Sequence, residues 1–151
     1  WRDWSSDVCS SDLNFTSEQT LDSDNQWKCE KCNILQNAVN KYTFWKLPKI
    51  LIISLKRFNK NMQKNERLVN YDINNLDLKN YCYSYEKNTL YDLYAVGCHK
   101  GNTQNGHYFS ICKNQNDKWY CYNDEQVIEM NDPSLIITNF AYCLFYKKKN
   151  I

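Results

Sequence analysis

Three polar residues in the C-terminal half of the chain have types and positions suited to proton transfer. His107 follows a glycine and opens a stretch rich in β-branched and aromatic residues, and Asn123 and Asp124 close another such stretch. An imidazole at the mouth of a strand can meet a substrate on one side, while a side-chain oxygen from the neighbouring strand holds its other nitrogen. The same pattern also fits an ordinary strand-end histidine and an Asn-Asp turn. The residues around it must decide between the two interpretations.

Three short strands are predicted to position these side chains. Residues 91–99 and 107–113 are rich in β-branched and aromatic residues, and residues 100–106 between them carry the Gly and Asn typical of loops. Residues 119–122 supply a further short strand. We therefore expect His107 at the start of one strand, beside a loop, and Asn123 at the end of the next.

The motifs around His107 belong to a longer ordered series. Around the histidine the chain reads HKG, GHY and KWYCYNDEQV, and the remaining motifs are WKCEKC (27–32), LPKILIISLKRF (47–58), YDLYAV (91–96) and AYCLFY (141–146). From about residue 27 to residue 147 the chain resembles the ubiquitin-specific proteases, papain-like cysteine peptidases that remove ubiquitin. The resemblance implies a thiol-dependent hydrolase of the bond after the C-terminal glycine of ubiquitin, with ubiquitin and ubiquitinated proteins as partners.

The resemblance assigns roles to the polar residues. Such a peptidase needs a thiolate, an imidazole that takes its proton, a group that orients the imidazole, and donors for the oxyanion. His107 matches the base that later acts as acid, because an unperturbed histidine pKa of about 6.5 permits both roles near neutrality. Asn123 matches the orienting residue, and Asp124 is its supporting or alternative partner.

Four further residues match the substrate channel of the family. His99, Gly101, Gly106 and Tyr108 are expected to line it, because small residues let an extended peptide tail approach the backbone closely. His99 also competes with His107 for the role of base. The alternative, that the two glycines only shape the turn, stays open.

No cysteine stands in the setting of the family's nucleophile, an Asn-x-Gly-x-x-Cys-type box. Cys9 is followed by Ser-Ser-Asp and has no glycine nearby. Cys98 lies beside His99 and Cys121 lies near Asn123, but adjacent side chains of a strand point to opposite faces, so neither is expected to share a site with its neighbour. The chain is therefore predicted to carry the base and the orienting residue without the nucleophile, and to be inactive alone.

Cys29 and Cys32 form a C-x-x-C pair, which is half of a tetrahedral zinc site. The family carries a second such pair earlier in its sequence, which this chain lacks. The resemblance implies one structural zinc in the parent protein, held partly by these two residues, and no cofactor for catalysis. A redox pair or the relic of a lost site are the alternatives.

Composition favours a folded chain in a reducing compartment. Of 151 residues, 42% are hydrophobic and 15% aromatic, with only 3 Gly and 2 Pro, which is enough to build a core. The net charge of +2 and a basic run confined to residues 147–149 do not indicate a nucleic-acid partner. The 8 cysteines come without a secretory signal, and no apolar run reaches the ~20 residues that span a bilayer. We predict a monomer in the cytoplasm, the nucleus or both.

The expected fold is α+β, a papain-like cysteine peptidase with a mostly antiparallel β palm and part of the fingers, and with the helical thumb missing. Residues 1–13 differ in composition from the rest and are interpreted as a non-native, adapter-like segment. Residues 14–147 are the C-terminal part of the catalytic domain, and 148–151 are a tail. The run ILIISL (50–55) is predicted to be a central strand buried on both faces. Without its covering partners, the isolated chain is expected to be poorly soluble or partly molten.

Three functional interpretations remain open. The first is the C-terminal piece of a deubiquitinating peptidase whose nucleophile lies upstream. The second is a non-catalytic ubiquitin- or protein-binding module from an inactive relative. The third is a small zinc-dependent interaction domain unrelated to peptidases.

Overall fold

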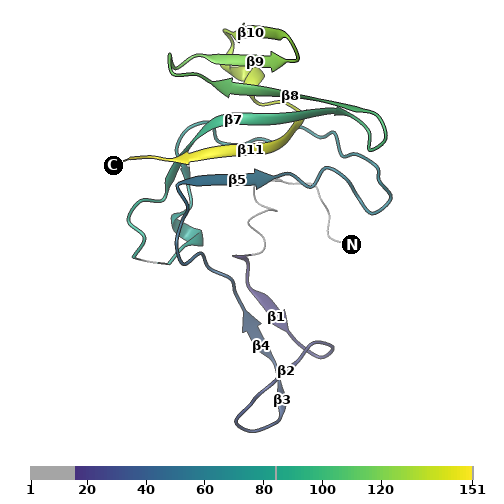
Figure 1. Ribbon diagram of the computed structural model, residues 1–151. Coiled ribbons are helices and arrows are strands. Elements are labelled where there is room, and N and C mark those ends of the chain that lie inside the picture. The colour runs from purple at the N-terminus through teal and green to yellow at the C-terminus, as the bar shows by residue number, and fades with distance from the viewer. Residues whose placement is uncertain (1–15, 84, 151) are drawn as a thin grey trace.

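The computed structural model describes residues 16–83 and 85–150, and its centre is one antiparallel sheet. The strands lie in the order β10-β9-β8-β7-β11-β5, and β6 pairs with β7 off this path (Figure 1). Their bounds are β5 (Ile50–Ser54), β6 (Leu76–Asp77), β7 (Leu90–Gly101), β8 (Gly106–Lys113), β9 (Trp119–Asn123), β10 (Gln126–Met130) and β11 (Ala141–Lys148). The strands predicted from the sequence around His107 are therefore present, and the last strand lies beside β7 as expected.

Two hairpins place the ends of β7, β8 and β9 close together. β7 and β8 stay paired out to Gly101 and Gly106, so their connecting loop is shorter than the sequence indicated. Gly101 has φ +110, a conformation that side chains rarely adopt, which explains glycine at the end of β7. β9 turns into β10 directly after Asn123.

One face of the sheet carries the hydrophobic core. Val96, Leu144 and Tyr146 have no exposed surface there, and buried side chains from the loops before β7 cover them. The hydroxyl of buried Tyr71 donates to the Ile136 carbonyl at 2.6 Å, and burial raises the pKa of this phenol. The satisfied hydroxyl lets a large aromatic ring close the core without an unpaired polar atom.

The prediction for residues 50–55 was wrong. β5 is an edge strand that pairs only with β11 among the described residues, and it is covered on one face. Ile50 and Ile52 are 43% and 58% exposed, whereas Leu51 and Ile53 pack against the core. A continuous apolar run is compatible with either position, because the sequence does not show which strands pair with it.

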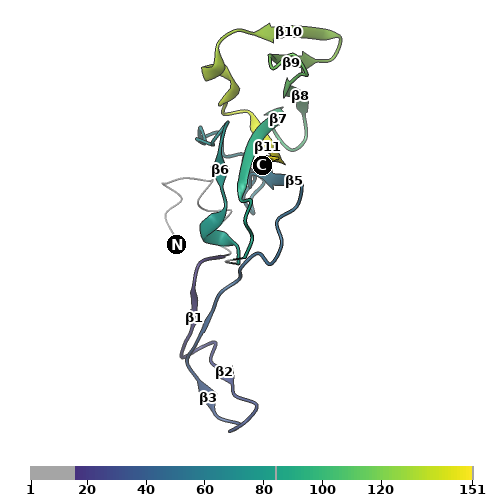
Figure 2. The ribbon, with the colours of Figure 1, turned by 90° about the vertical axis from the view of Figure 1, so that its left-hand side faces the viewer.

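A narrow arm extends away from the sheet (Figures 1 and 2). This finger arm, residues 19–40, consists of two small antiparallel pairs: β1 (Gln19–Leu21) with β4 (Ala38–Asn40), and β2 (Trp27–Lys28) with β3 (Leu35–Gln36). Trp27, Ile34, Leu35 and Val39 of the arm are each between 48% and 63% exposed. Two-stranded ribbons have no core of their own.

Helix is nearly absent from the part of the chain that the structure describes. The named helical elements are the 3-10 helices η2 (Lys79–Tyr81) and η3 (Pro133–Ile136). None of the described helices could span a bilayer. The suspected segment 1–13 lies outside the described residues.

Candidate active site

His107 and Asn123 meet across β8 and β9. The imidazole Nε2 lies 2.5 Å from the Asn123 side-chain oxygen Oδ1. Since an amide oxygen can only accept, this contact places the proton on Nε2 and leaves Nδ1 as the nitrogen that can take up another. The register pairs Ile111 with Cys121, so His107 and Asn123 share one face of the sheet and lie diagonally across it.

Asp124 lies on the far side of the same imidazole nitrogen. Its Oδ2 is 3.7 Å from His107 Nε2, and its side chain is 76% exposed. Asp124 has φ 50 and forms a two-residue turn with Glu125, because Asn123 and Gln126 are register partners. This turn gives Asp124 an electrostatic contact with a protonated imidazole, while Asn123 makes the closer hydrogen bond.

His99 occupies the opposite face and cannot serve the same site. It is the register partner of Tyr108, the neighbour of His107, so the pleat directs the two histidines to opposite faces. His99 is 3% exposed, and its Nδ1 has no hydrogen-bond partner among the described residues. Burial, and to a lesser degree the nearby Lys64 ammonium, lower the pKa of His99, so the ring is neutral at neutral pH.

An aromatic pocket surrounds His99. The ring centroid of His99 lies 4.6 Å from that of Tyr108 and 5.8 Å from that of Phe58. The pocket is lined by Phe58, Met62, His99, Asn102, Thr103, Gly106 and Tyr108. A β-carbon on Gly106 would collide with the His99 imidazole, so only glycine fits there. Three of the four predicted channel residues thus meet in one pocket, and Gly101 lies outside its lining.

The pocket also contains residues that the sequence did not single out. Phe58 and Met62 belong to a loop that folds back on itself, with Phe58 bridged to Lys64. Lys64 Nζ then donates to the His99 carbonyl oxygen at 2.6 Å and connects this loop to β7. These residues lie far from His99 in the sequence, and no local pattern marks them.

The cysteines near the site are not placed to act with His107. Cys98 is fully buried, and burial raises the pKa of its thiol to about 12. The expectation that Cys121 faces away from Asn123 was wrong, because residues two apart in a strand share a face and the register confirms this for β9. Cys121 nevertheless lies opposite Ile111, about 13 Å along β8 from His107. No thiol of the described residues is hydrogen-bonded to His107.

Cys29 and Cys32 occupy the tight turn between β2 and β3, at the tip of the finger arm. Backbone N–H groups of Cys32 and Lys31, and then the Cys32 thiol, lower the pKa of Cys29. A lowered thiol pKa suits a metal ligand. A tetrahedral zinc needs four ligands, and the described residues contain no cluster of three or more metal-binding side chains. Cys29 and Cys32 could therefore supply two of the four ligands of such a site.

A mostly antiparallel palm with a His–Asn pair at a strand mouth has the architecture of the corresponding part of a papain-like fold. Residues 8–146 match the family model described as ubiquitin carboxyl-terminal hydrolase, and the chain belongs to that family. It is 36% identical to human ubiquitin carboxyl-terminal hydrolase 43, over 90% of this chain and 14% of that protein. It is 35% identical to probable ubiquitin carboxyl-terminal hydrolase 1 of Schizosaccharomyces pombe, over 91% and 18%.

Solved structures agree with the fold. The match to the SAGA Ubp8/Sgf11/Sus1/Sgf73 DUB module bound to ubiquitin aldehyde has a TM-score of 0.81 at 28% identity. It covers 99% of this chain and 35% of the solved chain. The match to the same module bound to monoubiquitin has a TM-score of 0.78 at 27% identity, over 96% and 33%. The chain therefore spans about a third of the solved chains and 14% to 38% of the curated relatives named as ubiquitin carboxyl-terminal hydrolases.

Proposed function

We propose that this chain is the base-bearing part of a deubiquitinating cysteine peptidase. The observation that carries the proposal is the 2.5 Å contact between His107 Nε2 and Asn123 Oδ1, which fixes the ring and directs Nδ1 away from its partner. The proposed substrate is a ubiquitin conjugate, in which the bond after the C-terminal glycine of ubiquitin is cut. The relatives' names and the ubiquitin in the similar solved structures support this choice.

In this mechanism His107 moves the proton at Nδ1. It takes the proton of a cysteine thiol, and the thiolate attacks the carbonyl carbon of the terminal glycine. The imidazolium then donates that proton to the leaving amine as the C–N bond breaks and a thioester forms. His107 next takes a proton from a water molecule, which attacks the thioester, releases ubiquitin with a free carboxylate and restores the thiol. Asn123 holds the ring in one tautomer throughout and adds no full negative charge beside the thiolate–imidazolium pair. The nearby Asp124 carboxylate, at 3.7 Å, stabilises the imidazolium form.

The thiol must come from outside the described residues, because none of their cysteines contacts His107. Cys9 lies outside the described residues, and its sequence setting is not that of the family's nucleophile, so the 151-residue chain alone is proposed to be inactive and to require a segment that carries the nucleophile. We refer to this chain joined to that segment as the complete peptidase domain. The second candidate is a relative that has lost its nucleophile but still binds ubiquitin. The two candidates are distinguished by the nucleophile box, which would carry a residue other than cysteine in the second.

The tail of ubiquitin is proposed to run over the pocket beside His99 and Tyr108. Gly106 packs against the His99 ring in this pocket and directly precedes His107, and the tail is proposed to cross the start of β8 there to reach the catalytic face. At the arm tip, Cys29 and Cys32 are proposed to supply two of four zinc ligands in the complete protein, a structural role that adds no step to the reaction.

Substitution of Asn123 tests the proposal. In the complete peptidase domain, Asn123→Ala is expected to lower kcat about 10²-fold for release of a fluorophore from the ubiquitin C-terminus, because the imidazole loses its orientation. Asn123→Asp keeps an acceptor oxygen and is expected to retain most activity. Asn114→Ala, in the exposed turn before β9, is the matched control with unchanged kcat. Equal kcat values for Asn123→Ala and the control would remove Asn123 from the mechanism.

A further inference from the structure

The most enclosed ion pair in the described part of the chain lies far from the candidate active site. Lys148 Nζ is 2.9 Å from Glu86 Oε1, and each side chain is only 17% exposed. In each of the other ion pairs of the described residues, at least one side chain is more than twice as exposed. Surface pairs contribute little to stability, so an enclosed pair at this place calls for a structural reason.

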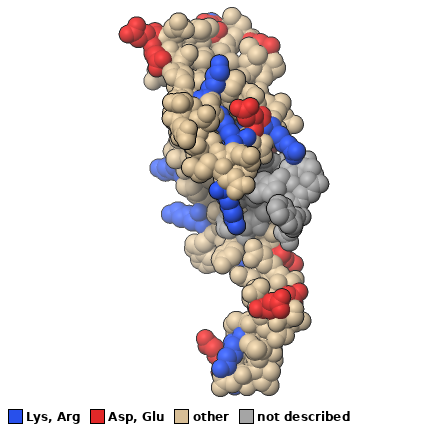
Figure 3. Space-filling view, turned by 90° about the vertical axis from the view of Figure 1, so that its right-hand side faces the viewer, with Lys and Arg blue, Asp and Glu red and all other residues tan. Residues whose placement is uncertain are grey.

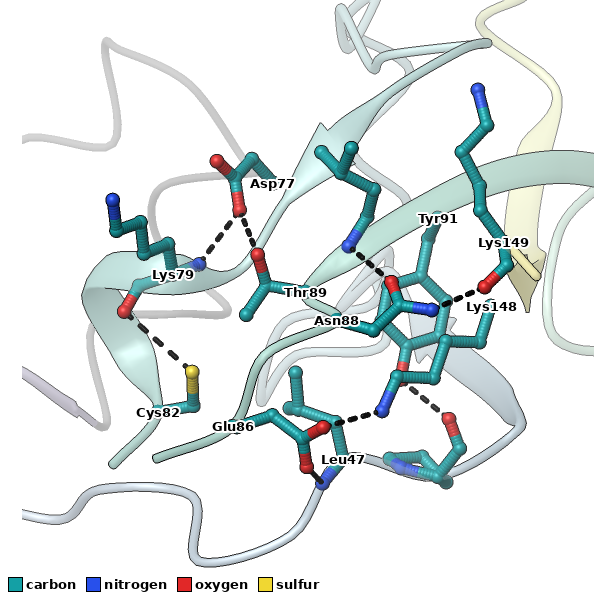
Figure 4. A network of polar contacts seen from close by, with 12 residues as sticks. Leu47, Asp77, Lys79, Cys82, Glu86, Asn88, Thr89, Tyr91, Lys148 and Lys149 are labelled. Atoms are coloured by element: carbon teal, nitrogen blue, oxygen red, sulfur yellow. Dashed lines mark hydrogen bonds and ion pairs between the residues drawn. The ribbon is translucent and has the colours of Figure 1, made fainter. Parts of the chain in front are cut away.

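The second carboxylate oxygen of Glu86 shows what the pair holds. Glu86 Oε2 accepts the backbone N–H of Leu47 at 3.3 Å (Figure 4). The hydrogen bond from the Lys148 ammonium, and then that from the Leu47 N–H, keep the pKa of Glu86 below its usual range, so the carboxylate stays charged at neutral pH. Glu86 thus connects the end of β11 to the segment that leads into β5.

That segment, residues 44–48, is the described connection from the finger arm to the sheet, and we call it the joint. Three further contacts fix it. Phe44 exchanges two backbone hydrogen bonds of 2.9 Å with Tyr81 and Tyr83, and the buried Tyr91 hydroxyl donates to the Pro48 carbonyl at 2.5 Å. The Trp45 ring packs on Tyr83 and Tyr85, with centroids 5.4 and 5.0 Å away. The joint is therefore held at both ends, and Glu86 supplies a charged contact to it.

The joint is one of two described connections of the finger arm to the rest of the structure, and residues 16–18, which lead into β1, are the other. The arm has no core, and its apolar side chains Trp27, Ile34, Leu35 and Val39 are about half exposed or more. On the face drawn in Figure 3 its surface is mostly uncharged, with a few acidic and basic side chains. An exposed apolar surface of this kind is typical of a protein–protein interaction site. The folded body of ubiquitin must lie outside the site, because only its C-terminal residues reach His107 in the proposed reaction.

The joint and the catalytic pair lie at opposite ends of β7. Tyr91, at the start of β7, is the register partner of Lys148, and Lys100, near its end, is the register partner of His107. The nine residue-to-residue steps from Tyr91 to Lys100 span about 30 Å of strand. A change at the joint can therefore alter the arm without touching the reacting atoms.

We propose that Glu86 and Lys148 are positioning residues that set the direction of the finger arm and so control the affinity for the folded body of ubiquitin, not the rate of cleavage. The proposal rests on the proposed function of this chain. It separates two properties of one enzyme: His107 and Asn123 govern kcat, and the joint governs KM for intact ubiquitin.

The test compares Glu86→Gln and Lys148→Met with Glu129→Gln. Gln keeps an oxygen for the Leu47 N–H and removes the ion pair, and Met keeps the length of the lysine side chain and removes its charge. Glu129→Gln breaks the exposed 2.6 Å pair between Glu129 of β10 and Lys118, which directly precedes β9, and is the matched control. Hydrogen exchange of the Leu47 amide, KM and kcat are all measured in the complete peptidase domain, the last two with intact ubiquitin and with a short tail peptide.

Both test variants are expected to speed exchange of the Leu47 amide about tenfold and to raise KM for intact ubiquitin about fivefold. They leave kcat and tail-peptide cleavage within twofold of the unmodified domain, and the double variant is no worse than either single one. Unchanged Leu47 exchange, unchanged KM, or equal losses on ubiquitin and tail peptide would overturn the proposal. An unmodified domain that cleaves neither substrate would refute the proposed function itself, which is a different outcome from an active domain insensitive to these variants.

Discussion

Replacing Gly106 with alanine is expected to displace the His99 ring. A β-carbon at this position would lie 3.0 Å from His99 Cε1 and 3.1 Å from Cδ2, and closer still to Nε2. These separations are shorter than carbon–carbon contact in packed proteins, about 3.5 to 4.0 Å. Gly106 has no unusual φ, so the conflict is purely one of space.

The surrounding rings determine the magnitude. His99 is 3% exposed and is enclosed by Phe58, Tyr108 and Tyr142, at centroid distances of 5.8, 4.6 and 6.0 Å. The imidazole therefore cannot move aside freely. Overpacking of this kind costs about 1–3 kcal/mol, and a loss near 2 kcal/mol lowers the urea midpoint by about 1 M for a domain with an m-value of about 2 kcal/mol/M.

Gly97→Ala is the matched control within the same strand pair. A β-carbon at Gly97 would meet Phe145 Cε2 at 3.6 Å and Cys143 Cβ at 3.7 Å, which are ordinary contacts. Urea unfolding followed by tryptophan fluorescence should place the midpoint of Gly97→Ala within about 0.3 M of the unmodified chain. Equal midpoints for the two alanine variants would refute the packing of His99 against Gly106.

Three further predictions concern the core, a buried base and the thiols. Leu144→Ala removes a side chain with no exposed surface and is expected to lower the free energy of unfolding by about 2–5 kcal/mol in urea titrations, whereas a loss below about 1 kcal/mol would contradict its place in the core. Burial and Lys64 lower the pKa of His99 in the folded state. As the pH falls below about 6.5, the unfolded chain therefore binds more protons at this residue than the folded chain does. The free energy of unfolding should decrease there and continue to decrease until the pH passes the folded pKa. His99→Phe should flatten this slope in urea midpoints taken from pH 8 to 5, and an unchanged slope would exclude His99 as its source. Iodoacetamide at neutral pH should modify Cys29 first and Cys98 last in peptide mapping, since the pKa of Cys29 is lowered and that of buried Cys98 is raised to about 12; early labelling of Cys98 would show that its strand opens.

The local sequence predicts the strands that form the site. β7, β8, β9 and β11 combine β-branched and aromatic residues with clear loop signals between them, and this information is contained in each segment. The edge position of β5 cannot be predicted from the local sequence, because it depends on whether a further strand pairs with β5, and none does among the described residues. An apolar run such as ILIISL has the same appearance in either place.

The site shows the same division between local and long-range information. The contact of His107 with Asn123 follows from strand order, because one residue opens a strand and the other closes its hairpin partner. The position of His99 on the opposite face depends on the register, which the sequence does not fix. Lys64, which reaches the His99 carbonyl from a distant loop, could be found only in the folded chain.

The measurement that tests the central claim most directly is the rate at which the complete peptidase domain releases a fluorophore from the C-terminus of ubiquitin, before and after His107→Ala. If His107 is the base, the substitution should lower kcat by about 10²- to 10⁴-fold, while the urea midpoint changes little because the side chain is about half exposed. The 151-residue chain alone should show no release. A His107→Ala domain that retains the unmodified rate, or release by the chain alone, would contradict the account.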